Sequence, residues 1–336
     1  MAILRAAAYL PTASVHGRRA LGPDEDGFTL AATAVERSVP PGTGPDGLRK
    51  VRVFGETGAA GPWGFGALLG AEVIVEPNAA DGPAFRAALR AAVDEAEPSL
   101  VVAVDSGSIG AGPGAVAFRV GRSTETGGPA IDRGPAEGAS TPLDVAFELF
   151  RSAGSPDRSV WVGDWEPNLL RLRPTSPRAE PTPVGGAAPV SEGAYVPRPR
   201  YLEGIDSRWR FLGERCATCG RVGFPARHRC RGCGRADRLE PYPLPKDGGK
   251  VEAVTWIGPG GQPTEFDGQV EASGPYGVVL VELIPGVRAT LQLTDCEPGG
   301  ARLGSTVVTR LRRLYPMEGE WRYGRKAIPI ESAGRP

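Results

Sequence analysis

Four cysteines are the residues whose type and spacing most clearly indicate chemistry. Cys216 and Cys219 form one C-x-x-C pair, Cys230 and Cys233 form a second, and ten residues separate the pairs. A C-x-x-C turn directs two thiolates toward one point, so two such turns predict a tetrahedral four-sulfur site, the geometry of structural zinc. Iron bound in place of zinc fits the same pattern, and two disulfides or four free thiols are the alternative. A glycine follows each pair and allows a tight backbone turn behind the metal.

The predicted metal has a structural role, because four sulfur ligands leave no coordination position open for catalysis. The fifth cysteine, Cys296, lies in T-D-C-E-P with no neighbouring histidine, and we interpret it as structural or incidental. Cysteines in a metal pattern favour a reducing compartment. We therefore expect a cytoplasmic protein.

Composition excludes several classes of function. The 336 residues predict two or three domains. Lys and Arg number 39, as do Asp and Glu, so no overall charge attracts nucleic acid or an anionic membrane. The N-terminus lacks the pattern of a signal peptide. No run of apolar residues approaches the ~20 needed to span a bilayer.

Strands and helices alternate in the N-terminal region, which predicts an α/β layered domain. The expected strands are 3–10, 51–54, 72–76, 100–104, 115–120 and 159–162, with another at 168–172. The expected helices are 28–38, 84–96 and 143–153. Asp24 or Asp26 is positioned to cap the first helix. The glycine-rich stretch 55–70 carries no predicted element.

Four short motifs give this region a family resemblance. They are Y-L-P at the end of the first strand, D-E-D-G-F-T-L-A at 24–31, L-V-V-A-V-D at 100–105 and G-P-G-A-V-A at 112–117. Together they resemble the first half of a thiolase-fold condensing enzyme, most closely 3-hydroxy-3-methylglutaryl-CoA synthase. The resemblance implies a thiolase-like fold for residues 1–173.

The catalytic residues of that family are missing. The family's nucleophilic cysteine lies on the turn before the long helix, here 78–82, but no cysteine precedes Cys216 in this chain. The only histidine before His228 is His16. Condensation needs a thiolate and an acid/base partner. We therefore expect a degenerate, truncated thiolase-like domain that does not condense; an unrelated small α/β domain is the alternative.

A proline-rich stretch separates this region from the cysteines. Residues 174–199 contain seven prolines, which predicts an extended linker. A helix is expected at 201–212, where Tyr201, Ile205, Trp209 and Leu212 recur at helical spacing. Such an aromatic stripe either packs in a core or borders a groove for a partner or ligand, and Trp209 is its candidate contact residue.

The C-terminal region predicts an all-β domain. The expected strands are 249–257, 276–284, 287–293, 305–314 and 321–330, separated by Pro/Gly breaks. Five short strands after a ribbon fit an OB-type barrel. Nucleic-acid binding would require exposed aromatics interleaved with basic residues. Only Arg310, Arg312, Arg313 and Tyr315 approach that pattern, so we expect no nucleic-acid partner.

A second resemblance covers residues 200–335. It rests on a predicted helix, then the motifs C-x-x-C-G, F-P-x-R and C-x-x-C-G, and then a segment predicted to be all-β. The matching residues are Cys216, Cys219, Gly220, Phe224, Pro225, Arg227, Cys230, Cys233 and Gly234. This pattern resembles the thiolase-associated zinc-ribbon/OB-fold proteins, domain of unknown function 35. The resemblance implies a rubredoxin-like zinc ribbon in an accessory subunit that binds thiolase-superfamily enzymes and helps hold acyl-CoA intermediates.

Arginines crowd the predicted ribbon and provide further candidate site residues. Guanidinium groups suit phosphate and carboxylate recognition. Arg227, His228 and Arg229, together with Trp209, are therefore candidate contacts to coenzyme A or to an acidic partner face. A solvated surface in an arginine-rich protein is the alternative.

The sequence predicts four segments and one preferred function. The segments are a thiolase-like domain (1–173), a linker (174–199), a helix with a zinc ribbon (200–248) and an OB-fold domain (249–336). The preferred function is a non-catalytic accessory subunit in a hetero-oligomer with a thiolase-superfamily enzyme. The alternatives are an acyl-CoA enzyme that uses Asp81, Asp105 or Glu56 instead of cysteine, and an OB-fold nucleic-acid binder.

Overall fold

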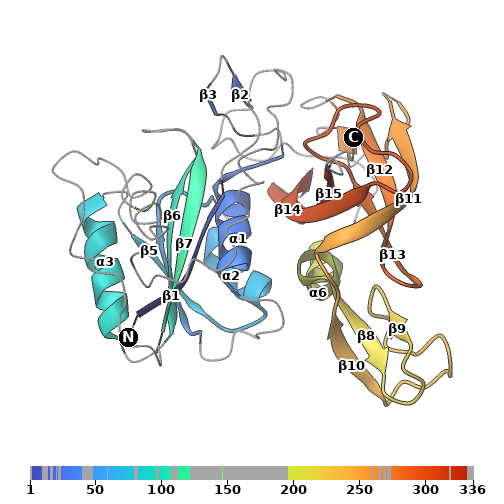
Figure 1. The fold of residues 1–336 in the computed structure, drawn as a ribbon, viewed down its shortest axis with the longest axis horizontal. Coiled ribbons are helices and arrows are strands. Elements are labelled where there is room, and N and C mark those ends of the chain that lie inside the picture. Colours follow the sequence, from blue (N-terminus) through green and yellow to red (C-terminus); the bar gives the residue numbers. More distant parts are fainter. Residues whose placement is uncertain are drawn as a thin grey trace, which may run out of the picture. The chain divides into compact units, whose positions relative to one another are not determined.

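The chain separates into two compact units, Met1–Gly185 and Gly186–Pro336 (Figure 1). The structure, a computed structural model, describes most of residues 2–121 and 196–330, with short gaps in both stretches, and residue 146. The predicted strands at 159–162 and 168–172 lie outside the described residues, as do most of the predicted helix at 143–153 and of the linker. None of the helices in the described part is long and apolar enough to cross a membrane.

A mixed five-stranded sheet forms the centre of the N-terminal unit, with strand order β1-β7-β6-β4-β5. Its strands are β1 (Ala2–Tyr9), β4 (Lys50–Phe54), β5 (Ile74–Asn78), β6 (Ser99–Asp105) and β7 (Gly114–Gly121), and a two-stranded hairpin joins β2 (Ser14–Val15) to β3 (Arg18–Arg19). β4 runs parallel to β5 and β6, whereas β7 is antiparallel to β6 and β1. The sheet strands occur where the sequence predicts them, within one or two residues.

Helices cover both faces of this sheet (Figure 1). α1 (Gly27–Ser38) and α2 (Gly61–Leu69) lie on one face, and α3 (Gly82–Asp94) lies on the other. α1 begins with a reciprocal cap: the Asp26 carboxylate accepts the N–H of Thr29 at 2.9 Å, and the Thr29 hydroxyl accepts the N–H of Asp26 at 2.9 Å. The cap satisfies two backbone donors that the helix leaves unpaired.

α2 is the helix of the N-terminal unit that the sequence patterns did not predict. Three glycines within it lower its helix propensity and suggest a loop. The reason for one of them is a close approach: a Cβ on Gly64 would collide with the ring of Phe28 in α1. Phe28 also packs edge-on against Phe65, with ring centroids 5.5 Å apart. Packing between α1 and α2 therefore overrides the weak local preference.

A continuous apolar core lies beneath α3. The rings of Phe54 and Phe85 meet edge to face at 5.3 Å, and Phe85 lies 6.1 Å from Phe118. All three side chains are buried, with Val101 and Val116 of the sheet beside them. Burial of each ring contributes about 1.5–3 kcal/mol to stability.

The C-terminal unit starts with two short helices and a small sheet. α5 (Arg198–Glu203) and α6 (Ile205–Arg210) precede the sheet β10-β8-β9, made of β8 (Leu212–Cys216), β9 (Val222–Gly223) and β10 (Leu239–Pro243). The prediction of one helix over 201–212 is therefore wrong. Gly204 interrupts the helix, and Phe211 adopts a left-handed φ of 54° that starts the strand at Leu212.

The remaining strands form a partly open barrel. They are β11 (Asp247–Ile257), β12 (Tyr276–Ile284), β13 (Val287–Gln292), β14 (Thr306–Met317) and β15 (Glu320–Ile330), in the order β13-β12-β11-β14-β15. The outer strands meet at a parallel bridge between Leu293 and Ala327, where the N–H of Thr294 donates to the carbonyl oxygen of Ala327 at 3.0 Å. Five strands joined in this way form a partly open β-barrel, the coarser part of the prediction of an OB-type barrel.

The small sheet and the barrel share one apolar core. Phe211 and Leu244, at the base of the small sheet, are buried in the same cluster as Val279 and Val281 of the barrel. Phe224 packs edge-on against Phe211, with ring centroids 5.4 Å apart. This shared core attaches the cysteine-bearing sheet to the barrel.

Candidate metal centre

Two turns with the same hydrogen-bond pattern carry the four cysteines. In the first, the N–H of Cys216 donates to the carbonyl oxygen of Arg221 at 2.9 Å, and the N–H of Gly220 donates to that of Cys216 at 2.8 Å. The second turn repeats this pattern at Cys230, with distances of 2.8 and 3.0 Å. Gly220 and Gly234 have φ of 72° and 75°, a conformation that glycine adopts without steric cost.

The four sulfur atoms converge on one point. The Sγ atoms all lie within 4.8 Å of one another; Cys216 and Cys233 are 3.6 Å apart, and Cys219 and Cys230 are 3.5 Å apart. Sulfurs about 2.3 Å from a tetrahedral zinc ion are roughly 3.8 Å from each other, so this donor set fits zinc. With four sulfur ligands, a bound zinc ion has no position for water or substrate, and its chemistry is structural.

The turns stabilise negative charge on sulfur. The backbone N–H of Cys233, with that of Gly232, lowers the pKa of the Cys230 thiol to about 6; the N–H of Gly232 lies 3.3 Å from this sulfur. The N–H of Arg221 acts in the same sense on Cys219, but neighbouring thiols, Cys230 first among them, raise the pKa of Cys219 to about 11. Thiolates this close together repel one another, and a bound cation would offset that repulsion.

Glu214, which no sequence pattern indicated, holds the loop between the two turns. Its carboxylate accepts the N–H of Arg227 at 2.8 Å and the N–H of His228 at 3.1 Å. The Nδ1 atom of His228 lies 3.5 Å from the same carboxylate, although its side chain is 93% exposed. Arg227, His228 and Arg229 are all exposed. Their role as contact residues stays a prediction, but the structure places their side chains where a partner can reach them.

Trp209 is a core residue and not a surface contact. Its side chain is 0% exposed. Its indole N–H lies 3.0 Å from the hydroxyl of Tyr201 and 3.0 Å from the carbonyl oxygen of Tyr323. At Trp209 the aromatic stripe therefore packs in a core and does not border a groove for a partner or ligand. A ligand could reach this indole only if the helices moved away from β15.

The enzyme hypothesis relies on three acidic residues, and two of them lie at one edge of the N-terminal sheet. Asp105 is the last residue of β6, and Glu56 follows the end of β4, the parallel neighbour of β6. Asp105 is buried and Glu56 is exposed, so the two carboxylates lie in different environments. The third, Asp81, lies outside the described residues, as does His16. A catalytic role for these acids stays a prediction.

Comparisons with known proteins agree with this geometry. A family model described as the rubredoxin-like zinc ribbon domain of ChsH2 matches residues 208–240. A DUF35 domain-containing scaffold protein of Methanocaldococcus jannaschii is 34% identical over 130 residues, 38% of this chain and 87% of that protein. One of Pyrococcus furiosus is 33% identical over 133 residues, 39% of this chain and 91% of that protein.

Among solved structures, the chain resembles one described as Ltp2-ChsH2(DUF35) aldolase. The sequence identity is 23% and the TM-score is 0.30; the match covers 38% of this chain and 90% of that chain. A TM-score this low does not define a common fold. The two sequence relatives, by contrast, are matched over most of their own length and at a higher identity. This chain therefore belongs to the family of DUF35 domain-containing scaffold proteins.

Proposed function

We propose that this chain is a non-catalytic accessory subunit that docks on a thiolase-superfamily enzyme and helps hold or pass acyl-CoA intermediates. The enzyme is a thiolase, a thiolase-like aldolase or a hydroxymethylglutaryl-CoA synthase. The single observation that carries the proposal is the closed four-sulfur cluster. Its coordination is complete, so its contribution is to fix a surface, and the chain belongs to a family of scaffold proteins.

In this proposal the N-terminal unit is a thiolase-like half that has lost the condensing reaction. Its mixed sheet with helices on both faces supports the layered fold expected from the resemblance. The absence of any cysteine before Cys216 supports the loss of chemistry. The proposal divides the chain into residues 1–173, 174–199, 200–248 and 249–336.

The partner supplies the catalytic residues, and the chain supplies contacts. Arg227, His228 and Arg229 are proposed to contact the partner or the phosphates of a coenzyme A thioester, which their exposure and the fixed loop beneath them support. None of the five cysteines forms a disulfide in the structure, and this fits the proposed location of the hetero-oligomer in a reducing cytoplasm.

Co-expression tests the proposal directly. The zinc-loaded chain is produced with the thiolase-superfamily enzyme encoded nearest to its gene, and acyl-CoA turnover is measured for the chain alone, the enzyme alone and the mixture. We expect the two proteins to elute together, with activity in the enzyme and none in the chain. Acyl-CoA turnover by the purified chain alone would instead favour the enzyme hypothesis.

A further inference from the structure

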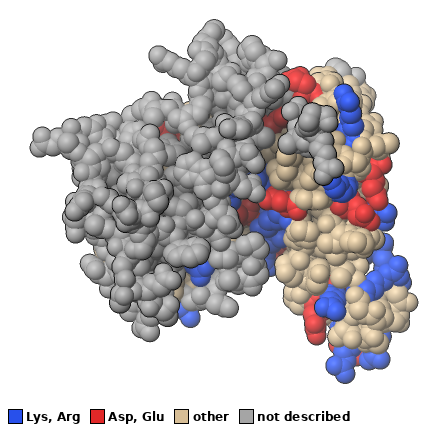
Figure 2. Space-filling model, in the orientation of Figure 1, with Lys and Arg blue, Asp and Glu red and all other residues tan. Residues whose placement is uncertain are grey.

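The zinc ribbon displays a set of arginine side chains to solvent. We call them the ribbon arginines; they are Arg215, Arg221, Arg227, Arg229, Arg231, Arg235 and Arg238, and all are exposed. Figure 2 shows blue side chains gathered over this end of the C-terminal unit. Against them, residues 214–240 contain only Glu214, Asp237 and Glu240 as acids. Zinc bound by four thiolates adds a net charge of about −2, and the ribbon stays positive.

The ribbon arginines differ from arginines elsewhere in the C-terminal unit in how they are paired. In the helices and the barrel, an acidic side chain lies within 4 Å of each of several arginines; examples are Arg200, Arg210, Arg288, Arg310 and Arg312. Among the described residues, only Arg235 of the seven has such a partner, Asp237 at 2.6 Å. Acidic side chains thus neutralise several guanidinium groups elsewhere in the unit. In the described part of the chain, the other six ribbon arginines have no such acidic neighbour and remain available to an external anion.

The backbone that carries these side chains is fixed on both sides. The two cysteine turns hold its ends, and Glu214 holds the intervening loop by accepting the N–H groups of Arg227 and His228. Preorganised charges lose less conformational entropy on binding than charges on a mobile loop. The arrangement therefore suits specific docking better than diffuse electrostatic attraction.

The surroundings favour a protein surface over a nucleic acid. Single-stranded nucleic acids are held by aromatic rings that stack on bases, and the only Phe, Tyr or Trp in 214–240 is Phe224, which packs on Phe211. The chain also divides its charge: Lys and Arg outnumber Asp and Glu by 22 to 17 in Gly186–Pro336, and the ratio is reversed in Met1–Gly185. The chain as a whole is neutral and its positive surface is confined to one unit. Such a surface is better suited to bind an acidic patch on a protein than a long polyanion such as a nucleic acid.

From this display we infer that the ribbon arginines form the docking surface for an acidic face of the protein partner, and that they steer the partner onto the ribbon. This inference rests on the proposed function and assigns the surface and the charge of its partner.

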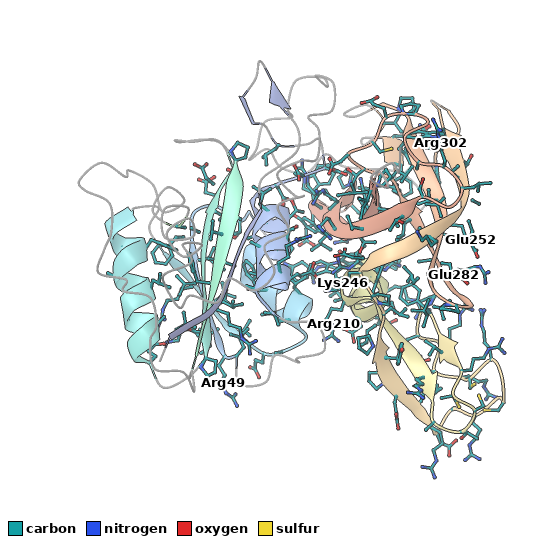
Figure 3. The ribbon with its side chains drawn as sticks, in the orientation of Figure 1. Arg49, Arg210, Lys246, Glu252, Glu282 and Arg302 are labelled. Atoms are coloured by element: carbon teal, nitrogen blue, oxygen red, sulfur yellow. The ribbon has the colours of Figure 1, made fainter. Side chains whose placement is uncertain are left out.

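Matched charge reversals test the inference in the full-length, zinc-loaded chain. One variant is Arg229→Glu with Arg231→Glu on the ribbon; the control is Arg200→Glu with Arg302→Glu, exposed residues of α5 and the barrel, of which Arg302 lies on the barrel in Figure 3. Association with the neighbouring-gene enzyme is measured at several ionic strengths, and zinc content confirms folding. We expect the ribbon variant to associate at least about tenfold more slowly at low salt, and the control to stay close to wild type.

Four further probes separate failure of the inference from failure of the proposed function. They are poly-L-glutamate, coenzyme A, single-stranded oligothymidylate and anionic lipid vesicles. If the enzyme binds both reversal variants equally, the inference fails and the proposed function stands. If the enzyme binds neither wild type nor variant, but poly-L-glutamate binds the control variant more tightly than the ribbon variant, the proposed function is wrong and the assignment of the surface stands. Tighter ribbon-dependent binding to any of the other three probes, or ribbon-dependent binding to none, overturns the inference.

Discussion

The hydroxyl oxygen of Tyr201 lies 2.8 Å from both the backbone nitrogen and the carbonyl oxygen of Tyr323. One side chain of α5 thus satisfies both polar backbone groups of a residue in β15, 122 positions later. Burial raises the pKa of Tyr201 to about 12, so its hydroxyl keeps the proton that it donates. This link attaches the helices before the ribbon to the barrel after it, and covers part of the outer strand β15.

Removing this hydroxyl should destabilise the C-terminal unit. In Tyr201→Phe the N–H of Tyr323 loses its 2.8 Å acceptor in a buried position. We expect the free energy of unfolding, measured by urea denaturation of the full chain, to fall by about 1–3 kcal/mol. Tyr242→Phe in β10, half-buried at the ribbon base, is the control. Equal effects of the two substitutions would show that the link does not stabilise the unit.

The contrast between predicted and observed elements has a physical basis. The barrel strands were predictable because apolar residues alternate along Val287–Gln292, Tyr276–Ile284 is a mostly apolar run, and Pro/Gly breaks separate the strands. The cysteine cluster was predictable because a C-x-x-C turn is local. The Tyr201–Tyr323 link, the carboxylate of Glu214 beneath the loop, and the Gly64–Phe28 contact that explains α2 join residues far apart in sequence, and no local pattern encodes them.

The metal should hold the ribbon together. Cys216→Ser or Cys230→Ser removes one of four converging ligands, and metal binding is coupled to folding in sites of this size. We expect loss of about one equivalent of zinc by elemental analysis and loss of partner binding. Cys296→Ser, outside the cluster, should keep its zinc. Full partner binding by a zinc-free Cys216→Ser protein would show that the ribbon does not form the docking surface.

A surface ion pair on the barrel should respond to pH. Glu252 of β11 accepts hydrogen bonds from Arg288 of β13, and a carboxylate oxygen of Glu282 of β12 lies 3.9 Å from the same guanidinium group. Figure 3 labels the two glutamates on the barrel. The hydrogen bond to Arg288 holds the pKa of Glu252 below its ordinary value of 4.5. Because the folded pKa is depressed, the pair stabilises the fold above pH ~4.5 and loses this contribution as pH falls through the folded value.

Arg288→Met should therefore raise the pKa of Glu252, measured from its side-chain carboxyl resonance in NMR titrations. The difference in urea midpoint between wild type and variant should shrink as the solution is acidified below the folded pKa. An unchanged Glu252 titration in the variant would contradict this assignment.

Two glycines of the N-terminal unit should differ sharply in their tolerance of alanine. Gly55 and Gly58 both have positive φ, 106° and 65°. A Cβ on Gly55 would collide with the carbonyl oxygen of Val104, whereas a Cβ on Gly58 meets nothing within 4 Å. We expect Gly58→Ala to cost about 1–2 kcal/mol of stability, and Gly55→Ala to cost a further ~1–3 kcal/mol because the backbone must shift. Thermal unfolding of the two variants would measure the difference, and equal costs would argue against the β4–β6 packing described above.

The most direct test of the central claim is a binding titration. The full chain, zinc-loaded or stripped of zinc by a chelator, is titrated into the neighbouring-gene thiolase-superfamily enzyme by isothermal calorimetry. We expect a saturable complex with the zinc-loaded chain, and binding at least about tenfold weaker after zinc is removed, because the ribbon surface depends on the metal. Absence of binding by the fully zinc-loaded chain would contradict the account.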